Sequence, residues 1–169
     1  MTSSELTKEL RMILEEELSL TLELTEIAQE KLLRLSDSDV KGLENVLQRE
    51  EDAAARLQDK ETQRLEAAAQ LAGILGLKPG EFRLKDLIDS IDNGTDKILL
   101  NETRQRLKFA VNSLARTNKK ALALAEQKIK YTDYIINLMY APQKKSNLYD
   151  VQGKLNENRA DTGRVDYTV

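Results

Sequence analysis

Apolar residues recur at spacings of three, four and seven over most of the chain, which is the pattern of amphipathic helices. The first such run covers residues 5–35, and the second covers residues 39–75. A short helix is expected at about 84–91 and a last, long one at 95–140. Two prolines and seven glycines in 169 residues leave these runs almost free of helix breakers. The pattern therefore predicts few helices, most of them long.

Polar and glycine-containing stretches separate the expected helices. The cluster LSDSD at residues 35–39 is rich in Ser and Asp, which cap helices and favour turns. The second helix is expected to end near GLKPGE at residues 76–81. An Asn-Gly turn at residues 93–94 precedes the last helix, whose start Thr95 and Asp96 favour.

The helical pattern stops after Pro142. Residues 141–169 have scattered apolar positions without a period and many Asn, Asp, Gly and Lys residues, which is typical of a flexible segment. The predicted fold is all-α: an elongated antiparallel coiled coil or helical bundle of three long helices with one short connecting helix. These helices form a domain of residues 1–140, and a flexible C-terminal tail of residues 141–169 follows it.

The last long helix carries two apolar stripes, whereas a helix that packs against one neighbour needs only one. The first stripe consists of Leu100, Leu107, Ala110, Leu114, Ala121, Leu124, Tyr131, Ile135 and Leu138. The same helical track that is polar before residue 111 becomes largely apolar after it and forms a second stripe. This second stripe consists of Val111, Ala115, Asn118, Leu122, Ala125, Ile129, Ile136 and Met139.

Two explanations of the second stripe stay open. The first long helix also has a broad apolar face, and it would cover part of the stripe by completing a three-helix core. Alternatively, the stripe binds an amphipathic helix of another protein. Burying about five aliphatic side chains contributes roughly 7 to 15 kcal/mol, from which association costs of roughly 4 to 15 kcal/mol must be subtracted. This balance favours a reversible partner over a permanent subunit.

The composition excludes several classes of chemistry. The chain has no Cys and no His, so it lacks thiolate nucleophiles, disulfides, the usual proton-transfer side chain and the commonest metal ligand. The carboxylates at residues 15–17 and 50–52 do not converge, because consecutive residues of a helix point about 100° apart. We therefore predict that the protein is not an enzyme and has no catalytic residues, no metal site and no cofactor.

Location follows from the absence of targeting signals. The N-terminal sequence MTSSELTKELRMILEEEL contains acidic residues throughout and lacks the apolar core of a signal peptide. No run in the chain approaches the roughly 18 apolar residues that suggest a membrane span. We expect a cytoplasmic protein that does not insert into membranes.

Charge is distributed unevenly among the expected helices. The first long helix is rich in Glu, and the last is rich in Lys and Arg, so we expect these two helices to pair. The basic helix could also suggest nucleic-acid binding through phosphate contacts. However, its basic residues are spread around the helix, the net charge is −3, and Phe82 and Phe109 are too few for a stacking surface. We therefore predict no nucleic-acid partner.

Several of these features resemble the FlgN family of flagellar type III export chaperones. The order of helices is similar, including the acidic first helix and the LSDSD turn. Asn118, in the segment RTNKKAL, falls where the family's long C-terminal helix carries an Asn. The segment NLYDVQG at residues 147–153 is similar to the family's L-Y-x-x-x-G element, with Tyr149 and Gly153 at its fixed positions. The resemblance covers nearly the whole chain.

The resemblance implies a cytoplasmic chaperone for the hook-filament junction proteins. It implies that the second stripe takes up an amphipathic helix at the C-terminus of the substrate and prevents its premature assembly. It also implies that Tyr149 and Gly153 dock on the flagellar export gate and ATPase complex, to which the substrate is delivered. The protein would be a monomer or a weak dimer.

An alternative from a different class is a self-associating coiled-coil scaffold or adaptor protein. In that case the second stripe would pair with a second copy of the chain. The two interpretations differ in oligomeric state, which can be measured.

Overall fold

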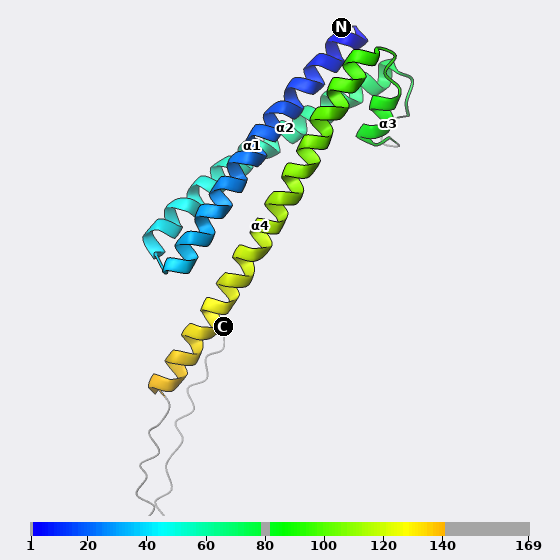
Figure 1. Ribbon diagram of the computed structural model, residues 1–169. Coiled ribbons are helices and arrows are strands. Elements are labelled where there is room, and N and C mark those ends of the chain that lie inside the picture. The colour runs from blue at the N-terminus through cyan, green and yellow to red at the C-terminus, as the bar shows by residue number, and fades with distance from the viewer. Residues whose placement is uncertain (1, 79–81, 141–169) are drawn as a thin grey trace, which may run out of the picture. The chain divides into compact units, whose positions relative to one another are not determined.

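The computed structural model describes residues 2–78 and 82–140, which form four helices and no strand (Figure 1). The all-α fold class is therefore confirmed for these residues. The helices are α1 (Ser3–Asp37), α2 (Val40–Ile74), α3 (Leu84–Asp89) and α4 (Gly94–Tyr140). The predicted flexible tail, residues 141–169, lies outside the described residues.

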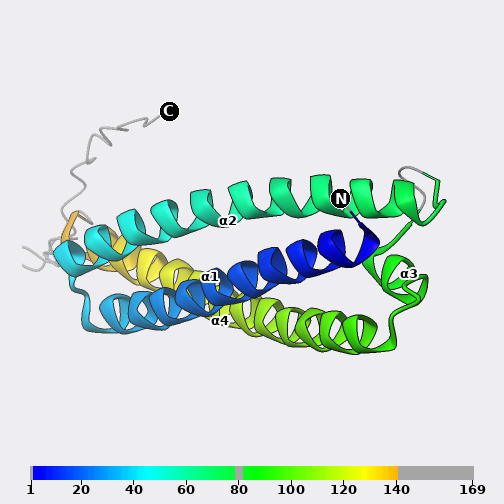
Figure 2. The ribbon, with the colours of Figure 1, turned by 90° about the horizontal axis from the view of Figure 1, so that it is seen from above.

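The chain divides into two compact units, Met1–Lys130 and Tyr131–Val169, and α4 belongs to both. In the first unit, α1 and α2 lie side by side and antiparallel (Figures 1 and 2). Up to Lys130, α4 runs in the same direction as α1. Hydrogen bonds join these two helices near both ends, from Ser4 Oγ to Asp96 Oδ2 at 3.2 Å and from Lys128 Nζ to the carbonyl oxygen of Ser36 at 3.1 Å.

Local capping chemistry explains where α1 and α2 begin. Thr2 and Glu5 form a capping box, in which the Thr2 amide donates to Glu5 Oε2 at 2.7 Å and the Glu5 amide donates to Thr2 Oγ1 at 3.3 Å. The turn between α1 and α2 places Ser38 in the left-handed region at φ 57°. Asp39 then caps α2, because its Oδ1 accepts a hydrogen bond from the Gly42 amide at 3.0 Å.

The start of α4 differs from the expectation. Asn93, expected only as a turn residue, is the side chain that caps this helix: its Oδ1 accepts from the Thr95 amide at 3.0 Å and from the Asp96 amide at 3.4 Å. Asn is a strong N-capping residue because its short side chain reaches these unpaired amides. Asp96 lies in the first turn, where its negative charge is favourable.

The core of the first unit consists of two apolar clusters. The larger cluster combines residues of all four helices with Ile91, and its members are Leu6, Leu10, Ile13, Leu14, Ala67, Ala68, Leu71, Ala72, Leu87, Ile88, Ile91 and Leu100. The smaller one lies nearer the α1–α2 turn and consists of Leu24, Ile27, Val46 and Ala53, with Leu57 and Leu114 packed against it. Both clusters therefore contain residues of α1 and α2.

A charged pair lies between the two clusters along α1 and α2. Glu17 is buried, and its Oε1 accepts a hydrogen bond from Arg64 Nε at 3.0 Å. Burial raises the pKa of the Glu17 carboxyl, and the charge of Arg64 partly opposes this shift. Arg64 of α2 thus faces Glu17 on α1, and this pair interrupts the apolar core.

The expectation that α1 and α4 pair by charge is wrong for the main acidic residues of α1. Ion pairs instead join α1 to α2, and they are Glu16 with Lys60, Glu17 with Arg64, Glu23 with Arg56 and Glu30 with Arg49, together with Lys31 and Glu50. In the described residues, Cα atoms of α1 and α2 approach within 8 Å, whereas those of α4 stay farther from both helices. The closer helix takes the acidic partners because charged side chains must come within about 4 Å to pair.

Candidate partner-binding site

The second stripe is not covered by α1 or α2. In the first unit, Val111, Leu122 and Ile129 expose 48%, 62% and 61% of their surface. Ala115 is exposed as well. The buried residues of α4 are instead Leu100, Thr103, Ala110 and Ala121, on a different face of the helix. The explanation that the first long helix covers the stripe therefore does not hold for its large apolar residues.

Asn118 and Ala125 form the inner edge of the second stripe, where both are half-buried. Asn118 Oδ1 accepts a hydrogen bond from Lys31 Nζ at 3.4 Å. The same ammonium group binds Glu50 Oε1 at 2.6 Å, so the three side chains link α4, α1 and α2. Asn118 thus faces the bundle, whereas Leu122 faces away from it.

Ile136 and Met139 belong to the second compact unit, whose described residues are 131–140. Both are exposed, as are the neighbouring large apolar and aromatic residues of this segment, which are Tyr131, Tyr134, Leu138 and Tyr140. These side chains surround the helix except on the side of Asp133 and Asn137, so the end of α4 is apolar over most of its circumference. The three tyrosines add apolar surface with a polar tip, a combination that is enriched at protein interfaces. Tyr134 and Tyr140 were not among the expected site residues.

Lys128 fixes the position of α4 at the α1–α2 turn. Its Nζ donates to the carbonyl oxygen of Ser36 at 3.1 Å and to Ser38 Oγ at 3.0 Å. These acceptors lie at the C-terminal end of α1, where unpaired carbonyl groups and the helix dipole favour a positive charge. Sequence reasoning missed this role because Lys128 was grouped with the exposed basic residues of the helix.

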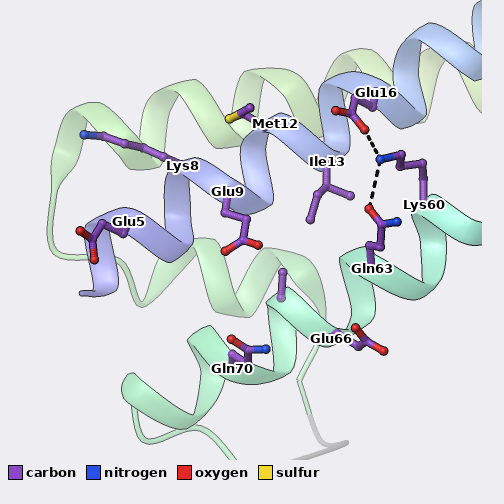
Figure 3. Close-up of a pocket in the computed structure, with 11 residues that line it drawn as sticks. Glu5, Lys8, Glu9, Met12, Ile13, Glu16, Lys60, Gln63, Glu66 and Gln70 are labelled. Atoms are coloured by element: carbon purple, nitrogen blue, oxygen red, sulfur yellow. Dashed lines mark hydrogen bonds and ion pairs between the residues drawn. The ribbon is translucent and has the colours of Figure 1, made fainter. Parts of the chain in front are cut away.

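The open face of the α1–α2 pair has a shallow groove (Figure 3). It is lined by Glu5, Lys8, Glu9, Met12, Ile13, Glu16, Lys60, Gln63, Glu66, Ala67 and Gln70. Lys60 lies between Glu16, with which it forms an ion pair, and Gln63, whose Oε1 accepts its hydrogen bond at 3.1 Å. In residues 2–78 and 82–140, no group of three or more acidic residues is placed to hold a metal ion.

The remaining expectations concern membrane insertion and the docking residues Tyr149 and Gly153. Among the described helices, none is long and apolar enough to cross a membrane. Tyr149 and Gly153, the expected docking residues for the export gate, lie outside the described residues.

A bundle of long helices with an exposed apolar stripe is typical of the class of proteins that bind helical partners. The family model described as FlgN protein matches residues 1–157, and the chain therefore belongs to the FlgN family. This is a family of flagellar export chaperones. No curated protein and no solved structure matched the chain.

Proposed function

We propose that this protein is a cytoplasmic chaperone that binds the amphipathic C-terminal helix of hook-filament junction proteins through the second stripe. The observation that carries the proposal is the exposure of Val111, Leu122 and Ile129 on a helix whose other face packs against the bundle. Ala115 and Ala125 extend this apolar surface within the first unit, and Asn118 limits it on the side of α1. Ile136 and Met139, in the second unit, are the other residues assigned to the stripe.

The size of the stripe fits a substrate that must later be released. Five aliphatic side chains contribute roughly 7 to 15 kcal/mol when fully buried, at about 1.5 to 3 kcal/mol each. Loss of motional freedom on association costs roughly 4 to 15 kcal/mol. The balance supports reversible binding, which a chaperone needs if its substrate is to be passed on.

Covering the terminal helix would also prevent premature assembly. Proteins that polymerise through terminal helices expose apolar stripes, which associate with one another when they are free. A chaperone that covers the apolar stripe of the substrate's terminal helix keeps the substrate unassembled until it reaches the export apparatus. In this proposal, Tyr149 and Gly153 dock on the export gate and ATPase complex, a role supported by the resemblance of NLYDVQG to the family element.

Size determination tests the proposed function against the alternative of a self-associating scaffold. We expect light scattering of the full chain to show a monomer or a weak dimer, and a stoichiometric complex after a purified junction protein is added. The complex should retain one chaperone per substrate when both are diluted to the micromolar range. A tight homodimer that does not respond to the junction protein would contradict the proposal and support the scaffold.

Tyr149→Ala is expected to separate delivery from binding. The variant should bind the junction protein as the wild type does, because the second stripe is unchanged. Export of that protein should fall, because the proposed docking contact loses its aromatic side chain. The measurement compares secreted junction protein and motility in cells that express either form. Unchanged export would remove Tyr149 from the docking site.

A further inference from the structure

Three lysines form a row beside the second stripe. Lys108, Lys119 and Lys130 are spaced eleven residues apart, and all three are exposed. Eleven residues correspond to about three turns of an α-helix, so the three side chains follow nearly one line along α4. We call these residues the lysine row. All of them belong to the first compact unit.

The lysine row borders the second stripe on the side away from the bundle. At about 100° per residue, the three lysines lie about 40° to 80° around the helix from Leu122. Asn118 lies about 40° from Leu122 in the opposite direction, and it contacts α1 through Lys31. The stripe is therefore bordered by the bundle along one edge and by positive charge along the other.

In residues 2–78 and 82–140, no acidic side chain neutralises this charge. Four acidic residues of α1 pair with α2 and not with α4, and they are Glu16, Glu17, Glu23 and Glu30. Within the described part of the chain, the lysine row forms no hydrogen bond or ion pair. Between residues 104 and 130 the sequence has a single acidic residue, Glu126. A partner that lies on the stripe thus meets unpaired ammonium groups along its outer edge.

We infer that the lysine row selects partner helices whose apolar face is bordered by acidic residues on the side that meets the row. This inference rests on the proposed function, because it assigns the chemistry of the helix that occupies the second stripe. Acidic residues spaced about eleven positions apart on the partner would align with the row, since both helices share the same rise per residue. Such pairs would set the orientation and register of the bound helix and would disfavour partners with basic borders.

A nonspecific electrostatic effect can be separated from this inference, because α4 provides a matched control. Arg106, Arg116 and Lys120 are also exposed, and they lie about 120° to 160° around the helix from Leu122. The triple variant K108Q/K119Q/K130Q and the control R106Q/R116Q/K120Q remove the same charge from different faces. Neither set of residues is in the core, so both variants should retain the helical content of the wild type.

The test measures the affinity of each full-length variant for a purified junction protein at about 50 and about 300 mM NaCl, a range over which screening increases strongly. We expect the lysine-row variant to bind about tenfold more weakly at low salt, because it loses three exposed ion pairs with the partner. Its affinity should also depend less on salt. The control should remain within about twofold of the wild type.

The other outcomes overturn the inference in distinguishable ways. An equal loss of affinity in both triple variants would show that the total positive charge of α4 is responsible, as in nonspecific nucleic-acid binding. The position of the row would then have no effect. An unchanged lysine-row variant, together with a loss of binding in Leu122→Asp, would refute the role of the row and leave the proposed function intact. If neither the row variant nor Leu122→Asp binds more weakly, the proposed function fails as well.

Discussion

Leu122→Asp is expected to weaken binding of a hook-filament junction protein by more than about 100-fold. In the free protein the Leu122 side chain exposes 62% of its surface, so a carboxylate at this position stays in water. In the complex it would be buried against the apolar face of the partner helix without a counter-charge, which costs several kcal/mol. Isothermal titration calorimetry measures the affinity, and far-UV circular dichroism should show unchanged helical content.

Two control variants make this result specific to the second stripe. Phe109 exposes 71% of its surface and lies about 140° around the helix from Leu122, so Phe109→Asp should bind nearly as the wild type does. Leu114 packs against the smaller core cluster, so Leu114→Asp should lower the melting temperature. If Leu122→Asp unfolds the protein, the stripe is part of the core. If it binds normally, the substrate occupies another surface.

The helices were predictable because their signals are local. Heptad spacing depends on neighbouring turns of one helix, and the capping residues act within a few positions of the helix start. Asp39 caps α2 from the predicted LSDSD turn. At the start of α4 the cap is Asn93, one residue before the helix and two before Thr95, because a cap must reach amides further along the chain.

The pairing of the helices was less predictable, because it depends on distances that one sequence does not contain. Both α2 and α4 offered basic residues to the acidic α1, and the choice followed the closer approach of α2. The direction of a side chain was equally hidden. Asn118 and Leu122 were assigned to one surface, yet four residues apart on a helix still differ by about 40°. That difference places Asn118 against Lys31 and leaves Leu122 in solvent.

The second stripe itself was visible in the sequence, but whether it was covered was not. An apolar position indicates burial against something, without distinguishing the same chain from a partner. The structure shows that the described residues of the same chain leave Val111, Leu122 and Ile129 exposed. The polar beginning of the same helical track provided the better signal. It showed that the extra apolar surface begins near residue 111 and does not follow the whole helix.

Leu100→Ala is expected to lower the free energy of unfolding by about 2 to 5 kcal/mol. Leu100 is fully buried in the larger cluster, where it contacts residues contributed by the other helices. The other fully apolar buried residues of α4, Ala110 and Ala121, have small side chains and contribute little buried area. Among the described residues of α4, Leu100 is therefore the large apolar side chain that is fully buried, whereas Leu107 and Leu114 are partly buried. Urea denaturation followed by circular dichroism measures the change.

Ile98→Ala is the matched control, because Ile98 lies two residues away on α4 and exposes 68% of its surface. Its loss of stability should stay within about 0.5 kcal/mol. If Leu100→Ala is as mild as this control, α4 must be held mainly by its other contacts, which are the packing of Leu107 and Leu114 and the hydrogen bonds of Asn118 and Lys128. If the expected loss is found, substrate binding should also weaken in Leu100→Ala near its melting temperature, because the second stripe is presented only while α4 remains docked. The stability of the core and the availability of the binding surface would then depend on the same helix.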